Sequence, residues 1–317
     1  MSESETSRDV DAATLRALMG RPDYLRFWLS RVAATLGVQI QSVALGWQVY
    51  AVARETMNVA QSAFFVGMIG LAAFIPVFLL ALPAGEAADR YDRKTILRLC
   101  YAAEITTALV LVAASVFGFA SLTLLLVLSA AFGASRAFMG PAGTALGPML
   151  VPRSLLPRAI ALNSLAWQGA SIIGPAIGGL LVALSPAASY AGAAGLYLFA
   201  LACIAGIRGN TRPEVNPGSR WALMKEGLAY VWTNKIVFGA ISLDLVAVLL
   251  GGATALLPVF ARDVLHVGPE GFGLLRASPA IGGLLVALSP AASYAGAAGL
   301  YLFALACIAG IRGNTRP

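Results

Sequence analysis

Three ionisable residues lie deep inside long apolar stretches of the chain. Glu104 is nine residues into a predicted helix that begins at residue 95, and Asp244 has a similar position in a later one. At a rise of 1.5 Å per residue, Glu104 is about 13 Å from the end of its helix. A carboxyl group at that depth in a membrane can bind and release a proton, because burial favours its neutral form. These residues predict proton binding inside a bilayer.

Arg136 lies in a third apolar stretch, about 10 Å from the nearer end of its predicted helix by the same rise per residue. It is a candidate charge partner for Glu104, because an unpaired charge within a bilayer costs several kcal/mol. Two interpretations follow from the residues. Glu104 and Arg136 form a buried structural pair, or Glu104 and Asp244 take part in proton coupling.

The composition predicts the elements that must position these residues. The chain has 317 residues, of which 59% are hydrophobic and 12% charged, with a mean hydropathy of +0.79. Soluble domains have about 25% charged residues. Several apolar runs reach the roughly 20 residues that cross a bilayer as a helix. We therefore expect an all-α polytopic membrane protein with about nine helices, over 24–53, 61–84, 95–118, 121–149, 158–184, 188–208, 236–261, 270–288 and 292–311.

Basic residues near the predicted span ends set the expected orientation. Lys and Arg are concentrated before the first span and in alternate loops after it, whereas the opposite loops up to the seventh helix contain only Arg54 and Arg262. The N-terminal tail, residues 1–20, is therefore expected to be cytoplasmic in a multi-pass protein of the plasma membrane, of the bacterial inner-membrane type. The net charge of +7 reflects this asymmetry, so no nucleic-acid partner is needed.

Enzymatic chemistry has little support in the sequence. The chain has a single histidine, His266, and lacks the G-x-x-x-x-G-K-[ST] loop that binds nucleotide phosphates. The three cysteines lie in or beside apolar runs, as small buried side chains do, and predict no disulfide or metal site. We expect no enzyme and no cofactor.

A short charged segment, GEAADRYDRK at 85–94, separates the second and third predicted helices. Gly85 permits a tight exit from a helix, and the charges fit either a general membrane-surface loop or a more specific contact. The segment resembles the signature loop of the major facilitator superfamily, Gly-x-x-x-Asp-Arg-x-Gly-Arg-Arg, and Asp92 stands where that pattern has its second glycine. The matching residues are Gly85, Asp89, Arg90, Arg93 and Lys94.

Two further segments resemble the same superfamily. Arg136 precedes Gly140 by four residues, like the family's Arg-x-x-x-Gly motif, in which the arginine is associated with proton coupling. The predicted fifth helix resembles the Gly-Pro-x-x-Gly-Gly motif of proton-coupled exporters through Gly174, Pro175, Gly178 and Gly179. The sequence of residues 20–278 most resembles the enterobactin-exporter-like branch of that superfamily.

The resemblance implies an organisation and an activity. It implies a six-helix half over 21–210, a cytoplasmic linker with an amphipathic helix over 211–235, and an incomplete second half over 236–317. It further implies proton-driven export of a small organic molecule, siderophore-like or drug-like, through a cavity lined by the first and fifth helices. Polar residues there are candidates for substrate contact or for hydrogen bonds between helices: Gln39, Gln41, Gln48, Asn163 and Gln168.

One 39-residue segment occurs twice without a substitution, at 175–213 and at 279–317. In the second copy the helices follow an odd-numbered span, so Arg312 and Arg316 would face outside, against the positive-inside rule. This favours a recombination or assembly artefact and a truncated chain. The alternative to an exporter is accordingly a transport-inactive membrane fragment that at most packs against other chains. The sequence does not predict an oligomeric state.

Overall fold

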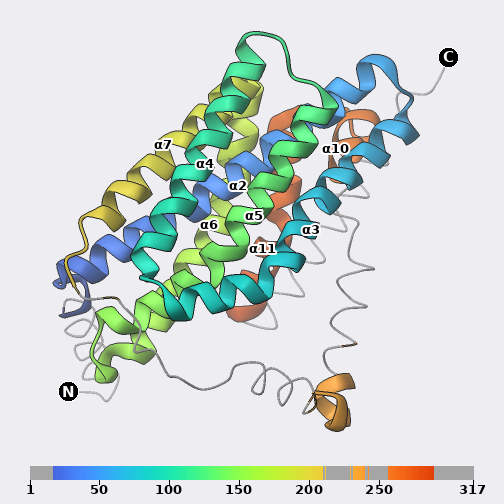
Figure 1. Ribbon diagram of the computed structural model, residues 1–317. Helices are drawn as coiled ribbons and strands as arrows, with labels where there is room; N and C mark the ends of the chain where they lie inside the picture. The colour runs from blue at the N-terminus through green and yellow to red at the C-terminus, as the bar shows by residue number, and fades with distance from the viewer. Residues whose placement is uncertain are drawn as a thin grey trace, which may run out of the picture.

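The computed structural model describes residues 17–209, 211, 229, 231–239, 242 and 256–288, and all regular secondary structure in these residues is helical. Figure 1 shows the long helices packed side by side in one bundle. They are α2 (Pro22–Thr56), α3 (Val59–Arg90), α4 (Arg93–Val116), α5 (Leu122–Leu146), α6 (Leu156–Leu184), α7 (Pro186–Ala205) and α11 (Pro269–Leu288). The shorter elements are two 3-10 turns, Gly147–Leu150 and Arg153–Leu155, and α10 (Leu257–Val259), which continues as a π-helical turn at Phe260–Val264.

The six helices from α2 to α7 lie where the first six predicted spans lie, with ends that differ by a few residues. Local signals explain where three of them begin. Asn58 and Gln61 form a reciprocal capping box at the start of α3, and Ser121 and Ser185 cap α5 and α7 through their hydroxyl groups. Such caps satisfy backbone N–H groups that the helix itself leaves unpaired.

The segment 85–94 was expected to be a loop, and this expectation is wrong. α3 continues through Gly85 to Arg90, whose guanidinium pairs with Glu86 one turn earlier at 3.0 Å. Glycine inside a helix costs only about 1 kcal/mol relative to alanine, so Gly85 does not end the helix. The stop comes from Asp92, whose side chain accepts the backbone N–H of Lys94 at 3.1 Å and caps α4.

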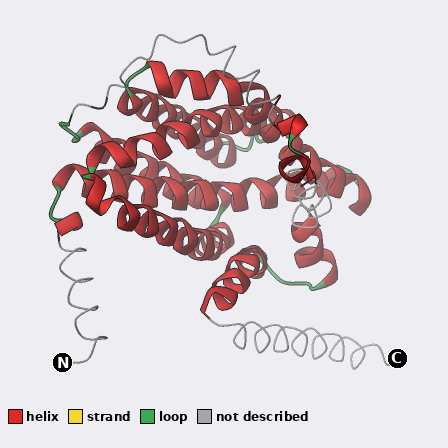
Figure 2. Cartoon of the chain, turned by 90° about the horizontal axis from the view of Figure 1, so that it is seen from below, coloured by secondary structure: helices red, strands yellow, loops and turns green. Residues whose placement is uncertain are grey.

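Within the described residues, the helices α3 to α7 are long and apolar enough to cross a membrane. α2 is long enough but is not among these five, and its composition includes basic residues and glutamines. Its position explains the difference, because α2 contacts α3, α5, α6 and α7 and is largely covered by protein. Figure 2 shows the bundle at right angles to Figure 1, with the helices in several layers.

Several sequence-based expectations lie outside the described residues. These are most of the tail 1–20 and of the linker 211–235, the predicted helix 292–311, Asp244, and residues 289–317 of the second copy. The predicted helix 270–288 is confirmed as α11. Residues 279–288 are therefore helical, as residues 175–184 of the first copy are in α6.

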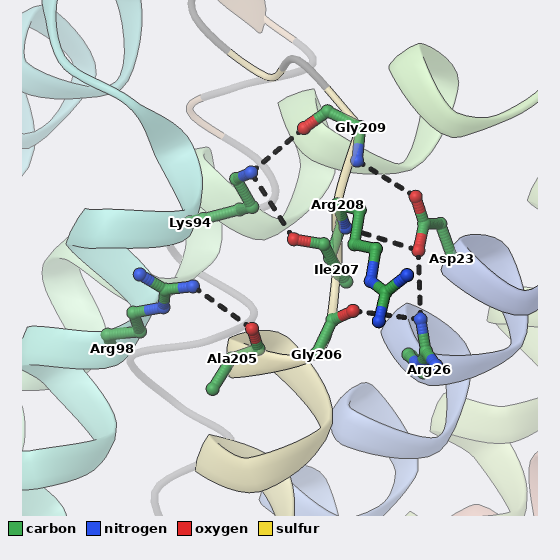
Figure 3. Close-up of polar contacts among 9 residues, drawn as sticks. All are labelled: Asp23, Arg26, Lys94, Arg98, Ala205, Gly206, Ile207, Arg208 and Gly209. Carbon is green, nitrogen blue, oxygen red and sulfur yellow. Dashed lines mark hydrogen bonds and ion pairs between the residues drawn. The ribbon is translucent and has the colours of Figure 1, made fainter.

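The helices from α2 to α7, which we call the six-helix unit, have their first and last ends tied together (Figure 3). The carboxylate of Asp23, at the start of α2, accepts the backbone N–H of Gly209 at 2.9 Å and that of Arg208 at 3.3 Å. Three basic side chains donate to carbonyl oxygens at the end of α7: Arg26 to Gly206 (2.8 Å), Lys94 to Gly209 (2.8 Å) and Arg98 to Ala205 (3.3 Å). These bonds satisfy carbonyl groups that a helix C-terminus leaves unpaired.

Candidate functional site

A cavity of about 660 Å³ lies among α2, α3, α5, α6, α10 and α11. Most of its lining is apolar, which suits the binding of an organic molecule, and a few polar groups are placed among the apolar ones. Three of the residues singled out in the sequence line it: Gln39 of α2, Arg136 of α5 and Pro175 of α6. Ser42, Ser129 and Arg276 add further polar groups.

Two arginines face this cavity, and neither forms an ion pair within 4.0 Å with a described residue. The guanidinium of Arg136 lies over the ring of Phe132, 5.5 Å from its centroid. Arg276 reaches α2, where its Nη1 atom would be 3.9 Å from a Cβ atom placed on Gly46. Neither guanidinium has a hydrogen bond or ion pair to a described residue, and none of the lining residues that the structure describes is acidic. Sequence reasoning missed Arg276 as a site residue, although an arginine in an apolar helix is itself a functional signal.

The glycines of the α6 motif allow close approach of two different helices. A Cβ atom on Gly174 would be 2.6 Å from Cβ of Gln39, and one on Gly178 would be 3.1 Å from Cα of Ile40, both on α2. Gly179 faces α11 instead. There an added Cβ would be 2.6 Å from the Pro269 carbonyl oxygen and 2.9 Å from Cα of Gly273.

The glycine of α11 at this helix crossing, Gly273, is equally close to α6. A Cβ atom on Gly273 would lie 2.4 Å from the carbonyl oxygen of Pro175. The backbones of α6 and α11 therefore touch at Gly179 and Gly273, as small residues permit between membrane helices. This contact brings α11, and with it Arg276, to the cavity.

Polar side chains of α2, α4 and α7 meet away from the cavity, in what we call the α2–α4–α7 seam. Near one end Ser30 Oγ donates to the hydroxyl of Tyr101 at 3.2 Å. Near the other end the Gln48 amide donates to Ser115 Oγ at 2.9 Å and accepts from the hydroxyl of Tyr190 at 2.6 Å. Gln48, predicted as a cavity residue, thus lies between helices.

Glu104 occupies the middle of this seam. It is fully buried, and neither carboxylate oxygen has a hydrogen-bond partner among the described residues. The same is true of the amide of Gln41 and the hydroxyl of Tyr197. Gln41 precedes Gln48 by seven residues, or two helical turns, and so faces the same side of α2.

The structure does not bring Glu104 and Arg136 into an ion pair. Glu104 lies in the seam and Arg136 in the cavity, and no contact within 4.0 Å joins their charged groups. A bare carboxylate at such a position would cost several kcal/mol, and a proton removes that charge. The position therefore suits a carboxyl group that holds a proton.

Lys94, the last of the signature-loop residues, takes part in the ties of Figure 3 through its bond to the carbonyl oxygen of Gly209. The Arg93 guanidinium donates to the Ala88 carbonyl oxygen at 3.0 Å, and Asp89 is exposed. Asp92, outside the membrane-spanning segments, also accepts the hydroxyl of Thr211. Burial raises its pKa, but hydrogen bonds from Thr211 and the Lys94 amide and the Lys94 charge outweigh this, so its pKa is lowered.

Two other predicted cavity residues, Asn163 and Gln168 of α6, are half-buried and are not among the residues that line the cavity. Of the five glutamines and asparagines singled out, only Gln39 lines it. The remaining candidate, Asp244, lies outside the described residues.

Comparison with protein families decides the class of this chain. Residues 17–289 match the model of the transmembrane secretion effector family, a major facilitator family. The chain belongs to the major facilitator superfamily. This is a family of multi-pass membrane transporters and not of enzymes.

Relatives of this major facilitator include transporters from several bacteria. It is 25% identical over 266 residues to the staphyloferrin A transporter of Staphylococcus aureus, covering 83% of this chain and 65% of that protein. It is 28% identical over 283 residues to the multidrug efflux pump Tap of Mycobacterium tuberculosis, covering 84% and 64%. The chain thus spans 64–65% of the length of these relatives.

Solved structures agree on the fold. A bacterial homologue of the human lysosomal transporter Spinster, crystallised in an inward-facing and unoccupied conformation, superposes with a TM-score of 0.65 at 17% identity. The match covers 83% of this chain and 60% of that one. A D-xylose–proton symporter gives 0.56 at 12% identity, covering 83% and 67%. At these identities the likeness concerns the fold of this major facilitator.

Proposed function

We propose that the protein exports a small organic molecule, siderophore-like or drug-like, in exchange for protons. The observation that carries the proposal is the cavity of about 660 Å³, which is mostly apolar and contains Gln39, Arg136 and Arg276. The relatives named for a siderophore and for multidrug efflux support this substrate class. The similarity to the enterobactin-exporter-like branch is part of the same proposal.

Proton coupling is assigned to Glu104 and Arg136, with Asp244 as a further candidate. Glu104 is the described intramembrane carboxyl without a hydrogen-bond partner, so gain and loss of a proton there would change the charge of the bundle. Arg136 lies in the cavity, where it would sense both substrate and protonation. The energy source is then a proton gradient, without a bound cofactor.

Orientation and location complete the proposal. The Lys and Arg distribution supports a cytoplasmic N-terminus, and the end of the bundle with Lys94, Arg98 and Arg26 would then face the cytoplasm. The bacterial relatives support the inner membrane as the location.

Inverted membrane vesicles energised by respiration test this proposal. Ethidium, added to vesicles that contain the full chain, should collapse part of the pH gradient, recorded by a pH-sensitive acridine dye. Glu104→Gln should abolish this proton movement, because the amide cannot exchange a proton, whereas Gln41→Leu in the same seam should retain it. Proton movement that is equal in Glu104→Gln and the parent chain would contradict the coupling role.

A second candidate function rests on the exact duplication of 39 residues. The protein would then be a membrane component that packs against other chains and does not transport. This candidate would be favoured over the exporter if the parent chain inserts normally into the vesicle membrane but neither ethidium nor a siderophore changes the pH gradient.

A further inference from the structure

We infer that the cavity binds an organic anion, a molecule that presents carboxylate groups to Arg136 and Arg276. This rests on the proposed function, since the cavity is treated as the substrate site. Both side chains line the same cavity from different helices, α5 and α11.

The charge balance of the cavity carries the inference. Arginine keeps its charge under all ordinary conditions, so two positive charges face one space. No described lining residue is acidic, and neither guanidinium has an ion pair or hydrogen bond to a described residue. Asp263 is a described acid in the π-helical turn before α11, but its carboxylate pairs with Arg54 and accepts the hydroxyl of Tyr50. It forms no ion pair with Arg136 or Arg276.

An anion between the two guanidinium groups relieves their mutual repulsion and provides the acceptors that both lack. Carboxylates suit the planar, forked guanidinium group because both oxygens can accept parallel N–H bonds. The neighbouring Gln39, Ser42 and Ser129 can donate further hydrogen bonds to the same ligand.

The apolar part of the lining separates an organic anion from an inorganic one. Val66, Ile69, Phe74 and Val77 of α3 and Phe132 of α5 form much of the wall. A volume of about 660 Å³ is within the range of pockets for small organic ligands. A bare chloride or phosphate ion would leave that apolar wall without contact.

Thermal unfolding of the purified full chain in detergent tests the inference, with citrate as the probe. Citrate should raise the unfolding midpoint. Its neutral triethyl ester should not, and neither should sodium chloride at the same ionic strength. Arg276→Gln and Arg136→Gln should each raise the half-maximal citrate concentration about tenfold or more, since each removes a charge-assisted contact. Arg276→Lys keeps the charge and should lose less.

Arg153→Gln is the matched control, because Arg153 is exposed and does not line the cavity. A citrate response that is unchanged in both glutamine variants, or a chloride response that is as large as that of citrate, overturns the inference. If Arg276→Gln does not elute as a single species, Arg136→Gln and Arg276→Lys provide the same comparison.

The outcome is separable from that of the exporter proposal. Citrate binding that depends on Arg276, without proton movement in vesicles, keeps the anion site and contradicts the exporter. Ethidium-driven proton movement without any citrate response keeps the exporter and contradicts the anion site.

Discussion

The α2–α4–α7 seam and the crossing of α6 with α11 join helices by different means. In the seam, side chains form directional hydrogen bonds, such as those from Gln48 to α4 and α7. At the crossing, backbones touch through Gly179 and Gly273, and no polar side chain bridges them among the described residues. Hydrogen bonds set the register of helices, whereas glycine contacts allow close approach without setting a bonded partner. We therefore expect the seam to resist displacement more than the crossing does.

The difference matches what alternating access would need in the proposed exporter. One group of helices rocks against another around a central site, so contacts within a group should be fixed and contacts between groups adjustable. The seam lies within the six-helix unit, and the crossing joins that unit to α11. Four predictions test this comparison, in order of decreasing expected effect.

The largest effect is expected at the crossing. In Gly179→Leu the new side chain would meet the Pro269 carbonyl oxygen and the Gly273 backbone, which cannot move aside as a flexible side chain can. We expect α11 to be displaced and ethidium-driven proton movement in vesicles to fall about tenfold or more, a loss equal to a barrier change of about 1.4 kcal/mol.

Gly169→Leu is the control for this change. It lies on the same helix, and an added Cβ there meets no atom within 4 Å. If the two variants transport equally well, close contact of α6 with α11 is not required for transport.

The second effect tests the seam through a matched pair of glutamines. Gln48→Leu removes bonds to Ser115 and Tyr190 and leaves the buried Tyr190 hydroxyl without an acceptor. It should lower the free energy of unfolding by about 1–2 kcal/mol, measured by titration with SDS. The amide of Gln41 has no partner among the described residues, so Gln41→Leu should be neutral or stabilising. Equal losses in the two variants would refute the bonding pattern of the seam.

A smaller effect is expected at the other end of the seam. Ser30→Ala removes one hydrogen bond to Tyr101 and should cost about 0.6 kcal/mol of unfolding free energy. Tyr101→Phe and the double variant complete a thermodynamic cycle, which isolates the pair from the packing of each side chain. A coupling energy of zero would show that the two hydroxyl groups do not interact.

The smallest effect lies outside the membrane, at Asp92. Its pKa is lower in the folded protein than its ordinary value of 3.8, so its charged form stabilises the fold above that value. This contribution should be lost as the pH falls through the folded pKa. Asp92→Asn keeps a capping side chain but does not titrate, so the difference in unfolding midpoint between parent and variant should shrink below pH 3.8. A difference that is constant from pH 6 to pH 3 would contradict this.

Much of the fold could be predicted from the sequence, because apolar runs of helix length identify spans and caps such as Asn58 mark their ends. The rotation of each helix could not. When apolar and small residues surround a helix, its composition does not indicate which face meets which neighbour. Gln39, Gln41 and Gln48 were therefore candidates alike for substrate contact or for hydrogen bonds between helices, although Gln41 and Gln48 are on another side of α2 from Gln39.

The seam nevertheless left a signal in the sequence. Ser30, Gly37, Gln41 and Gln48 recur at seven- or four-residue steps along α2, and this spacing follows one helix face. Gly37 belongs to it because an added Cβ would lie 2.9 Å from the ring of Tyr197. Such spacing predicts a shared face, but the partner helices come only from the packing.

The ties between Asp23 and the end of α7 bear on chain connectivity. Because Asp23 holds the N–H of Gly209 at 2.9 Å, the first and last residues of the six-helix unit are neighbours in space. A short peptide could join these ends, and new termini could be opened in another loop, such as the one between α4 and α5. A circularly permuted six-helix unit should therefore keep the same bundle.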